Sequence, residues 1–436
     1  MICACSVMTQ HCCERSLSKS DLIWRNVEFL LLLAGIIGTP LLEGVRNTGL
    51  LGFMAIWLVN RFRLKDFKLA WDRWDLAVIL FALSMLATQL AVALEDNLAT
   101  KVSHVLRYLI LFFMLRYSQF STRQYWLILA ALTLSIFVGM AWSWPDYLNT
   151  HNFIALRLPN IQHVNHASLY VLIAFQFLLS GLLYILFRGR WLLFTALAIS
   201  LVIVGAWLMA ASSRAAIGVA ALSIVVALIP VMMRSRKVAV IALVVLLSGI
   251  GLLATVFPGV IAKQNQWSVL FEGKLTPRER IWNTALEAYP EAPWLGRGYN
   301  EYKQLTEDYI KEVAKSRGET YSPDRFWFVE HAHNVYLTWL VEHGGIGLFC
   351  LLFFFLVWLI TLFQDFSRLR EDPIFACWWT IAMNTLLTLT VAGLVTTTMR
   401  RDTAFIALMA LGLYLSYSRW GARRMLAGNK EGVWSE

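Results

Sequence analysis

The sequence predicts an all-α integral membrane protein with about 12 transmembrane helices and one large helical loop outside the membrane. Hydrophobic residues make up 58% of the 436 residues and charged residues only 15%, whereas ordinary soluble chains are about 25% charged. Apolar runs near the ~20 residues that cross a bilayer recur along the chain. A single long polar segment, residues 258–334, interrupts them.

Each apolar run is assigned to one helix, in chain order. The second and fourth runs are short for a span, and Arg214 separates the seventh from the eighth by very little. A count of eleven to thirteen is therefore compatible with the pattern. The predicted spans cover residues 27–43, 48–60, 76–94, 102–115, 125–143, 169–187, 191–210, 215–233, 238–257, 346–363, 374–396 and 403–417.

Lysine and arginine set the orientation, because short cytoplasmic segments are enriched in them. With a cytoplasmic N-terminus, 21 of the 38 basic residues fall in cytoplasmic segments and 7 in short outer segments. The rest lie in the long outer loop, to which the rule does not apply. Both termini are thus expected in the cytoplasm. The net charge of +10 is explained by basic residues that flank the membrane spans on the cytoplasmic side. No nucleic-acid partner is expected.

The expected domains follow from this topology. Residues 1–257 hold transmembrane helices 1–9, residues 258–345 form the outer loop with amphipathic helices, and residues 346–436 hold helices 10–12 and a cytoplasmic tail. In the loop, Thr276-Pro277-Arg278-Glu279 is a capping box with proline at the first helical position. A second helix is expected from Asn300 to Arg317.

The apolar stretch Val335–Val341 stops at Glu342-His343-Gly344-Gly345. It is too short to span a bilayer, so it is expected to lie at the membrane interface.

The six cysteines do not form a disulfide framework. Cys350 and Cys377 lie in apolar runs, and the other four crowd the first 13 residues. Those four indicate either a metal site or a loose leader. No apolar segment typical of a signal peptide accompanies them.

Histidine placement suggests chemistry on the outer side. The predicted topology puts seven of the eight histidines at or beyond the outer face. An imidazole with its ordinary pKa near ~6.5 can accept a proton at neutral pH. His331 and His333 are the strongest candidates for acid–base chemistry or substrate binding, with a zinc site or a structural pair as alternatives. The seven are His104, His151, His163, His166, His331, His333 and His343.

Arginines near the outer face are candidate phosphate ligands, because the guanidinium fork matches phosphate oxygens. Arg214 interrupts a long apolar region, although it could instead extend to the outer surface. Arg278 and Arg280 open the first loop helix, where the helix dipole favours an anion; a solvated helix start is the alternative. For Arg107 and Arg400-Arg401, two roles remain possible: binding phosphate, or extending to the outer surface.

The chain has no nucleotide-binding glycine loop, no Gly-x-Ser-x-Gly elbow and no acidic metal cluster. These absences disfavour a soluble nucleotide-sugar enzyme. Arginines and histidines beside a large apolar body instead fit an amphiphilic, phosphate-bearing substrate such as a polyprenyl-diphosphate-linked sugar.

Three motif groups then occur in order. They are Ser213-Arg214-Ala215, then Arg278-Glu-Arg-Ile-Trp282 with Pro293-Trp-Leu-Gly296-Arg-Gly298, and finally His333-Asn334-x-Tyr336-Leu337 with Glu342-x-Gly344-x-x-Gly347. With the many spans and the single large loop, the chain resembles the bacterial O-antigen ligase and O-antigen polymerase superfamily. Motifs carry this resemblance over about residues 205–365, and topology alone carries it elsewhere.

The resemblance implies a membrane glycosyltransferase of the GT-C type in the bacterial inner membrane, with its large loop and active site facing the periplasm. Such an enzyme transfers glycan from undecaprenyl diphosphate without a nucleotide or a required metal, and no cofactor is expected. For a ligase, the donor carries O-antigen and the acceptor is a sugar hydroxyl of lipid A–core, in lipopolysaccharide biosynthesis.

By the same resemblance, Arg214 and Arg278 bind the diphosphate and His333 activates the acceptor hydroxyl. Arg280 and His331 leave each assignment open to a near neighbour. About twelve spans with a late single loop favour a ligase over a polymerase, and a protein O-oligosaccharyltransferase of the same superfamily remains an alternative. A lipid-linked glycan transporter is the non-enzyme alternative, but it would carry polar residues near the bilayer midplane.

Overall fold

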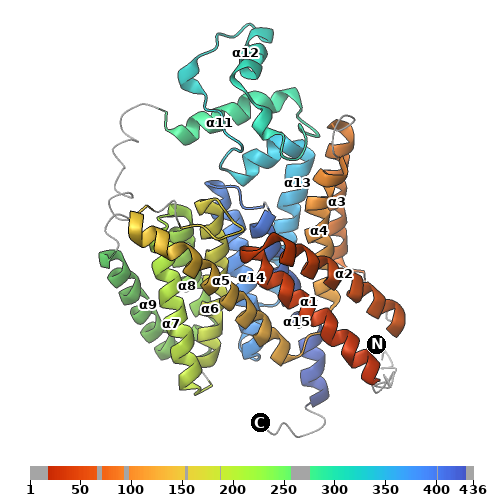
Figure 1. Cartoon of the computed structure of the whole chain (residues 1–436), viewed down its shortest axis with the longest axis vertical. Helices are drawn as coiled ribbons and strands as arrows, with labels where there is room; N and C mark the ends of the chain where they lie inside the picture. The colour runs from red at the N-terminus through yellow and green to blue at the C-terminus, as the bar shows by residue number, and fades with distance from the viewer. Residues whose placement is uncertain are drawn as a thin grey trace, which may run out of the picture.

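A computed structural model describes residues 18–65, 71–92, 98–152, 156–186, 188–256, 275–399 and 401–428. The fold is all-helical, with 82% helix and no strand in these ranges. Its long helices form one body, above which the segment 275–334 stands apart (Figure 1). The cysteine-rich N-terminus and residues 258–274 lie outside the described residues.

The long helices of the body occur in two groups, separated by the loop. The first group is α1 (Lys19–Leu41), α2 (Glu43–Leu64), α3 (Arg73–Val92), α4 (Leu98–Tyr117), α5 (Thr122–Thr150), α6 (Val164–Leu186), α7 (Trp191–Ala210), α8 (Arg214–Arg234) and α9 (Arg236–Val256). The second group is α13 (Val335–Gln364), α14 (Pro373–Thr390) and α15 (Arg401–Gly428).

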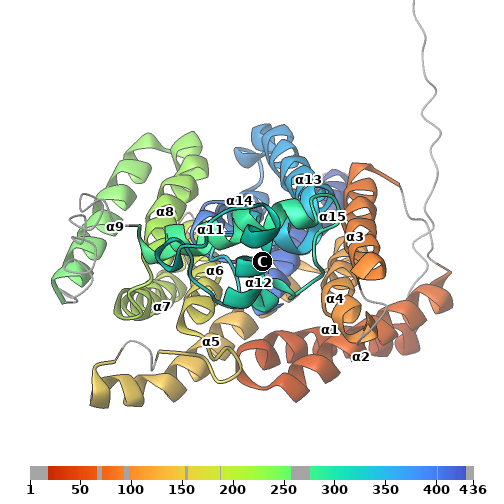
Figure 2. The same cartoon turned by 90° about the horizontal axis from the view of Figure 1, so that it is seen from above.

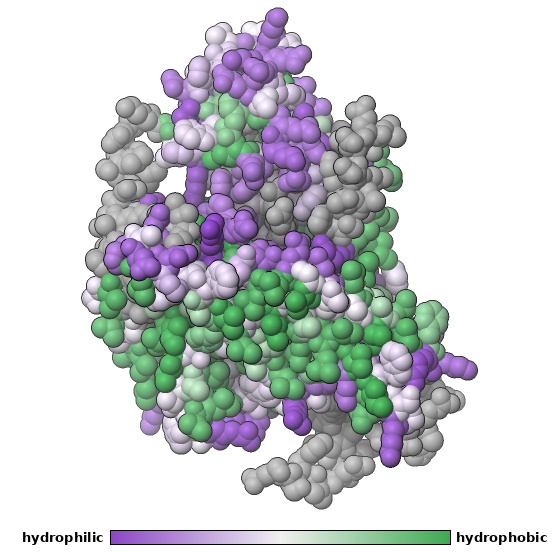
Figure 3. Space-filling view, viewed as in Figure 1, coloured by the Kyte–Doolittle hydropathy of each residue, from purple (hydrophilic) through white to green (hydrophobic). Residues whose placement is uncertain are grey.

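Every predicted span overlaps one of these long helices. By length and composition, eight helices among the described residues are apolar enough to cross a membrane: α1, α3, α5, α6, α7, α8, α13 and α14. The chain is thus a multi-pass membrane protein, and the count of twelve spans remains a prediction. On the face shown in Figure 3, apolar residues form a band across the body, and the segment above it is mostly polar.

Helix α6 forms the centre of the body. Of the residues in its apolar 18-residue stretch, 94% are buried. The helix packs against α14, α7, α8 and α15. A helix that is apolar on every face is stable only where neighbouring helices or lipid cover all of its faces. Figure 2 shows the loop helices α11 (Pro277–Ala288) and α12 (Glu307–Ser316) above this central region.

The first loop helix is confirmed as α11 (Pro277–Ala288). The Thr276 side chain accepts from the backbone N–H of Glu279, and the Glu279 carboxylate accepts from the N–H of Thr276, at 2.6 Å. This capping box and the proline at the helix start fix where α11 begins. The place of Arg278 in the first turn of α11 therefore follows from the local sequence.

The second loop helix was predicted to begin too early. It is α12 (Glu307–Ser316), begins after the N-cap Thr306 and is preceded by a 3₁₀ turn at Tyr302–Gln304. Asn300 has a positive φ of 63°, and the Thr306 hydroxyl accepts from the N–H of Tyr309. Apolar spacing predicts a start at Asn300, whereas the actual start is determined by this cap.

The predicted short apolar segment at residues 335–341 exists as a separate stretch of helix, because α13 (Val335–Gln364) consists of two helices that meet at a kink. Its position at the membrane interface remains a prediction. The predicted break at residues 342–345 does exist, because Gly344 has φ 67° and ψ −171° inside the helix. The domain boundary expected at residue 345 therefore falls beside this break.

Candidate functional site

Four histidines meet where the loop joins the body. His163 and His166 lie at the start of α6, and His331 and His333 lie just before α13. Successive ring centroids are 5.3 Å apart for His163–His166, 5.9 Å for His166–His331 and 4.4 Å for His331–His333. The structure therefore assembles one imidazole cluster from segments about 170 positions apart.

Asn334 positions His333 by starting α13. Its side-chain oxygen accepts from the N–H groups of Tyr336 at 2.9 Å and Leu337 at 3.0 Å, and its amide donates to the Leu394 carbonyl at 3.1 Å. An asparagine in this position satisfies the free N–H groups of a helix start. His333, with φ 47°, therefore lies directly before the residue that caps α13.

His333 is a half-buried imidazole among basic neighbours. Burial lowers its pKa from the ordinary value of 6.5, and the positive charge of Arg278 and the proximity of His163 lower it further. Since protonation is disfavoured, the ring is neutral at neutral pH. A neutral imidazole is the form that can accept a proton.

Arg278 and Arg214 approach each other from different parts of the chain. Arg278 lies in the first turn of α11, and Arg214 is the first residue of α8. The pKa of Arg278 is lowered first by desolvation and then by the charge of Arg214. Two guanidinium groups that repel each other form a site that an anion would stabilise.

Trp282 connects α11 to the histidine segment. Its indole N–H donates to the carbonyl of Ala332, between His331 and His333, at 3.1 Å. Residues four apart share one helix face, so this bond also directs Arg278 toward His333. The Arg-x-x-x-Trp spacing thus has a structural reason.

The loop is joined to α13 by an exchange of backbone hydrogen bonds at the helix break. The carbonyls of Val341 and Glu342 accept from the N–H groups of Arg297 and Gly298, both at 2.9 Å. In return, the N–H groups of Gly345 and Ile346 donate to the carbonyls of Pro293 at 2.8 Å and Trp294 at 3.2 Å. These four groups of α13 would bond to each other in an unbroken helix.

Arg280 does not share the surroundings of Arg278. Its guanidinium carbon lies 5.0 Å from the centre of the Trp327 ring, and Nη2 donates to the Pro323 carbonyl at 3.0 Å. Both partners belong to the loop, so Arg280 stabilises the loop itself. The sequence alone could not distinguish the two arginines.

The other candidate site residues either lie away from this cluster or are not among the residues that the structure describes. Arg107 donates to the Asn47 side chain at 3.1 Å. His151 caps the end of α5, and His343 is buried against the ring of Trp339 at 4.5 Å. Arg400 and the side chains of His104 and Arg401 lie outside the described residues.

Sequence reasoning missed the buried ion pairs, among them Arg116 with Asp75 at 2.9 Å. Arg46 of α2 and Asp402 of α15 are 2.6 Å apart and both are buried. Arg46 also pairs with Glu43 at 2.6 Å. No local pattern in the sequence indicates a contact between helices at opposite ends of the chain.

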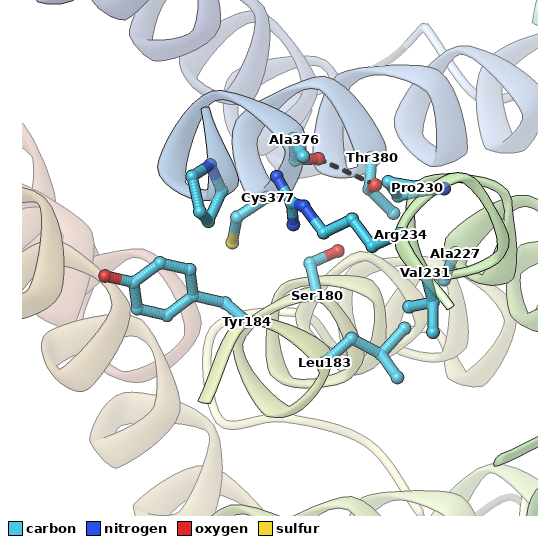
Figure 4. Close-up of a pocket in the computed structure, with 11 residues that line it drawn as sticks. Ser180, Leu183, Tyr184, Ala227, Pro230, Val231, Arg234, Ala376, Cys377 and Thr380 are labelled. Carbon is cyan, nitrogen blue, oxygen red and sulfur yellow. Dashed lines mark hydrogen bonds between the residues drawn. The ribbon is translucent and has the colours of Figure 1, made fainter. Parts of the chain in front are cut away.

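Among the described residues, no group of three or more histidine, cysteine or acidic side chains is arranged to hold a metal ion. A pocket between α6, α8 and α14, lined by Arg234 and Cys377 (Figure 4), has a volume of about 20 Å³. That volume is enough for about one water molecule and is too small for a sugar substrate.

Comparison with protein families matches the part of the chain that contains the two arginines and the His331–His333 pair. Residues 199–352 match the family model described as O-antigen ligase. This region of the chain is therefore similar to the O-antigen ligase family. This confirms the resemblance to the O-antigen ligase and polymerase superfamily, whose members are membrane glycosyltransferase-like enzymes. No curated protein matches the chain.

The O-antigen ligase match includes Arg214, Arg278, His331 and His333. It ends in α13, just after the break at Gly344. His163 and His166, which complete the imidazole cluster, come from outside the matched O-antigen ligase region. The family match alone would not have found them.

Proposed function

We propose that this protein is an O-antigen ligase. It transfers O-antigen glycan from undecaprenyl diphosphate to a sugar hydroxyl of lipid A–core, on the periplasmic side of the bacterial inner membrane. The observation that carries the proposal is the meeting of two arginines and His333 at the junction of loop and body. This junction is where a lipid-linked diphosphate would meet a water-soluble sugar chain.

In this mechanism Arg214 and Arg278 bind the diphosphate of the donor. Their guanidinium groups offer paired hydrogen bonds to phosphate oxygens, and the bound anion offsets their mutual repulsion. As the bond between the sugar and the diphosphate breaks, negative charge grows on the departing diphosphate. Fixed cations that stabilise developing charge can supply a large part of a rate enhancement.

His333 acts as the general base. It accepts the proton of the acceptor hydroxyl while that oxygen bonds to the anomeric carbon of the donor, and undecaprenyl diphosphate leaves with the bonding electron pair. The lowered pKa of His333 keeps the ring neutral before the reaction. No step requires a metal, because the diphosphate is already a good leaving group and the arginines bind its charge.

Lipopolysaccharide profiling of a deletion strain tests the proposed function. Loss of every O-chain, with accumulation of lipid-linked polymer, is expected for a ligase. Chains of one repeat on lipid A–core would instead indicate a polymerase. Unchanged lipopolysaccharide with loss of glycan from proteins would indicate a protein O-oligosaccharyltransferase, and donor that fails to reach the periplasm would indicate a transporter.

A further inference from the structure

A cavity lies at the end of the body away from the loop. It opens between α1, α2 and α5 and has a volume of about 460 Å³. Pockets that bind small molecules span roughly 300–1,000 Å³. Its polar lining includes Arg25, Asn26, Asn60, Arg61, Arg123 and Gln124.

The cavity wall is positively charged. Three arginines line it, against the single carboxylate of Glu28, which accepts a hydrogen bond from the Asn60 amide at 2.6 Å. Arg61 is held in place by the Tyr117 carbonyl and by the Trp57 ring, whose centre is 4.8 Å from the guanidinium carbon. The wall therefore keeps an excess of positive charge and favours an anionic ligand.

The rim of the same cavity is apolar. Leu22 of α1 and Leu127 of α5 both line the cavity, and they are 54% and 41% exposed. Both belong to helices that are apolar enough to cross a membrane. A cationic cavity with an apolar rim at the end of membrane helices matches a molecule with an anionic head and hydrocarbon chains.

We propose that this cavity binds the phosphate headgroup of an anionic phospholipid, with the acyl chains lying along α1 and α5. The site is separate from the histidine cluster, which lies at the other end of the body. A free phosphate ester shares the headgroup chemistry, but the exposed Leu22 and Leu127 favour the lipid.

Binding of phosphatidylglycerol to the purified full-length protein, measured by native mass spectrometry, tests the proposal. The double variant Arg25→Gln/Arg123→Gln should bind phosphatidylglycerol about thirtyfold more weakly, at about 1 kcal/mol for each arginine near a lipid surface. Arg25→Lys/Arg123→Lys keeps the charge and should lose much less. Arg190→Gln, an exposed arginine at the α6–α7 turn that does not line the cavity, should leave binding unchanged.

Equal binding by the wild type and the double glutamine variant would overturn the proposal, as would an equal loss in Arg190→Gln. If the double variant does not fold, Arg123→Gln alone, at an exposed position in the first turn of α5, should still lower binding about fivefold. Glycerol 1-phosphate is the soluble probe. Binding as tight as that of phosphatidylglycerol would overturn the assignment to a lipid.

Discussion

Gly296 of the loop and Gly344 of α13 approach each other so closely that neither has room for a Cβ atom. A Cβ on Gly296 would lie 2.5 Å from the backbone nitrogen of Gly344, and one on Gly344 would lie 2.3 Å from the carbonyl carbon of Trp294. Both residues also have positive φ, at 70° and 67°. This contact fixes the loop, which carries Arg278, to the helix that follows His333.

Replacing either glycine by alanine should therefore separate the loop from the body. Gly344→Ala and Gly296→Ala should lose nearly all activity and expose residues 275–334 to limited proteolysis. Gly318→Ala is the matched control, because Gly318 also has positive φ, at 69°, but nothing lies near its Cβ position. It should cost only about 1–2 kcal/mol of backbone strain and keep activity. Equal losses in all three variants would contradict this role for the contact.

The arginines should differ in what they do. Arg214→Ala and Arg278→Ala should lose transfer while the protein still inserts and folds, and lysine should substitute poorly because it lacks the planar fork. Arg280→Ala should instead lower the thermal stability of the loop and keep most of the turnover of the folded enzyme. Initial rates normalised to folded protein, with melting temperatures, separate the two effects. Full activity of Arg278→Ala with loss in Arg280→Ala would reverse the assignment.

The pH dependence should reflect the surroundings of His333. Its pKa lies below 6.5 and the neutral ring is the base, so kcat/KM should stay constant down to a pH below 6.5 and then fall. Arg278→Gln removes a charge that lowers this pKa, so the acid limb of its residual activity should move to higher pH. Arg278→Lys keeps the charge and should leave the limb in place. An identical limb in Arg278→Gln would show that another group titrates.

The predicted topology can be tested by cysteine labelling in intact spheroplasts. Ser316 and Ser322 are exposed in the loop, so Ser316→Cys and Ser322→Cys should react with an impermeant reagent added from outside. The four N-terminal cysteines are first replaced by serine to remove background. Arg190→Cys, at the α6–α7 turn, should react only after lysis. Protection of both loop positions would place the loop in the cytoplasm and rule out a periplasmic site.

The sequence predicted those features that depend on local chemistry. The long apolar helices, the capping box at Thr276 and the break near Gly344 all follow from residues close together in the chain. The start of α12 was missed because apolar spacing in that segment extends across a 3₁₀ turn. Contacts between distant segments could not be predicted: His166 beside His331, Arg46 paired with Asp402, and the separation of Arg280 from Arg278 all depend on packing.

The most direct test of the central claim is the rate of glycan transfer by purified enzyme, with lipid-linked donor, lipid A–core acceptor and EDTA. Loss of a general base typically costs 10²–10⁴-fold. His333→Ala should therefore lower transfer by about that factor and bind donor almost as well as the wild type, and the wild type should remain active in EDTA. Near wild-type transfer by His333→Ala would move the role to His331. Transfer at the wild-type rate by the His331→Ala/His333→Ala double variant would contradict base catalysis by histidine.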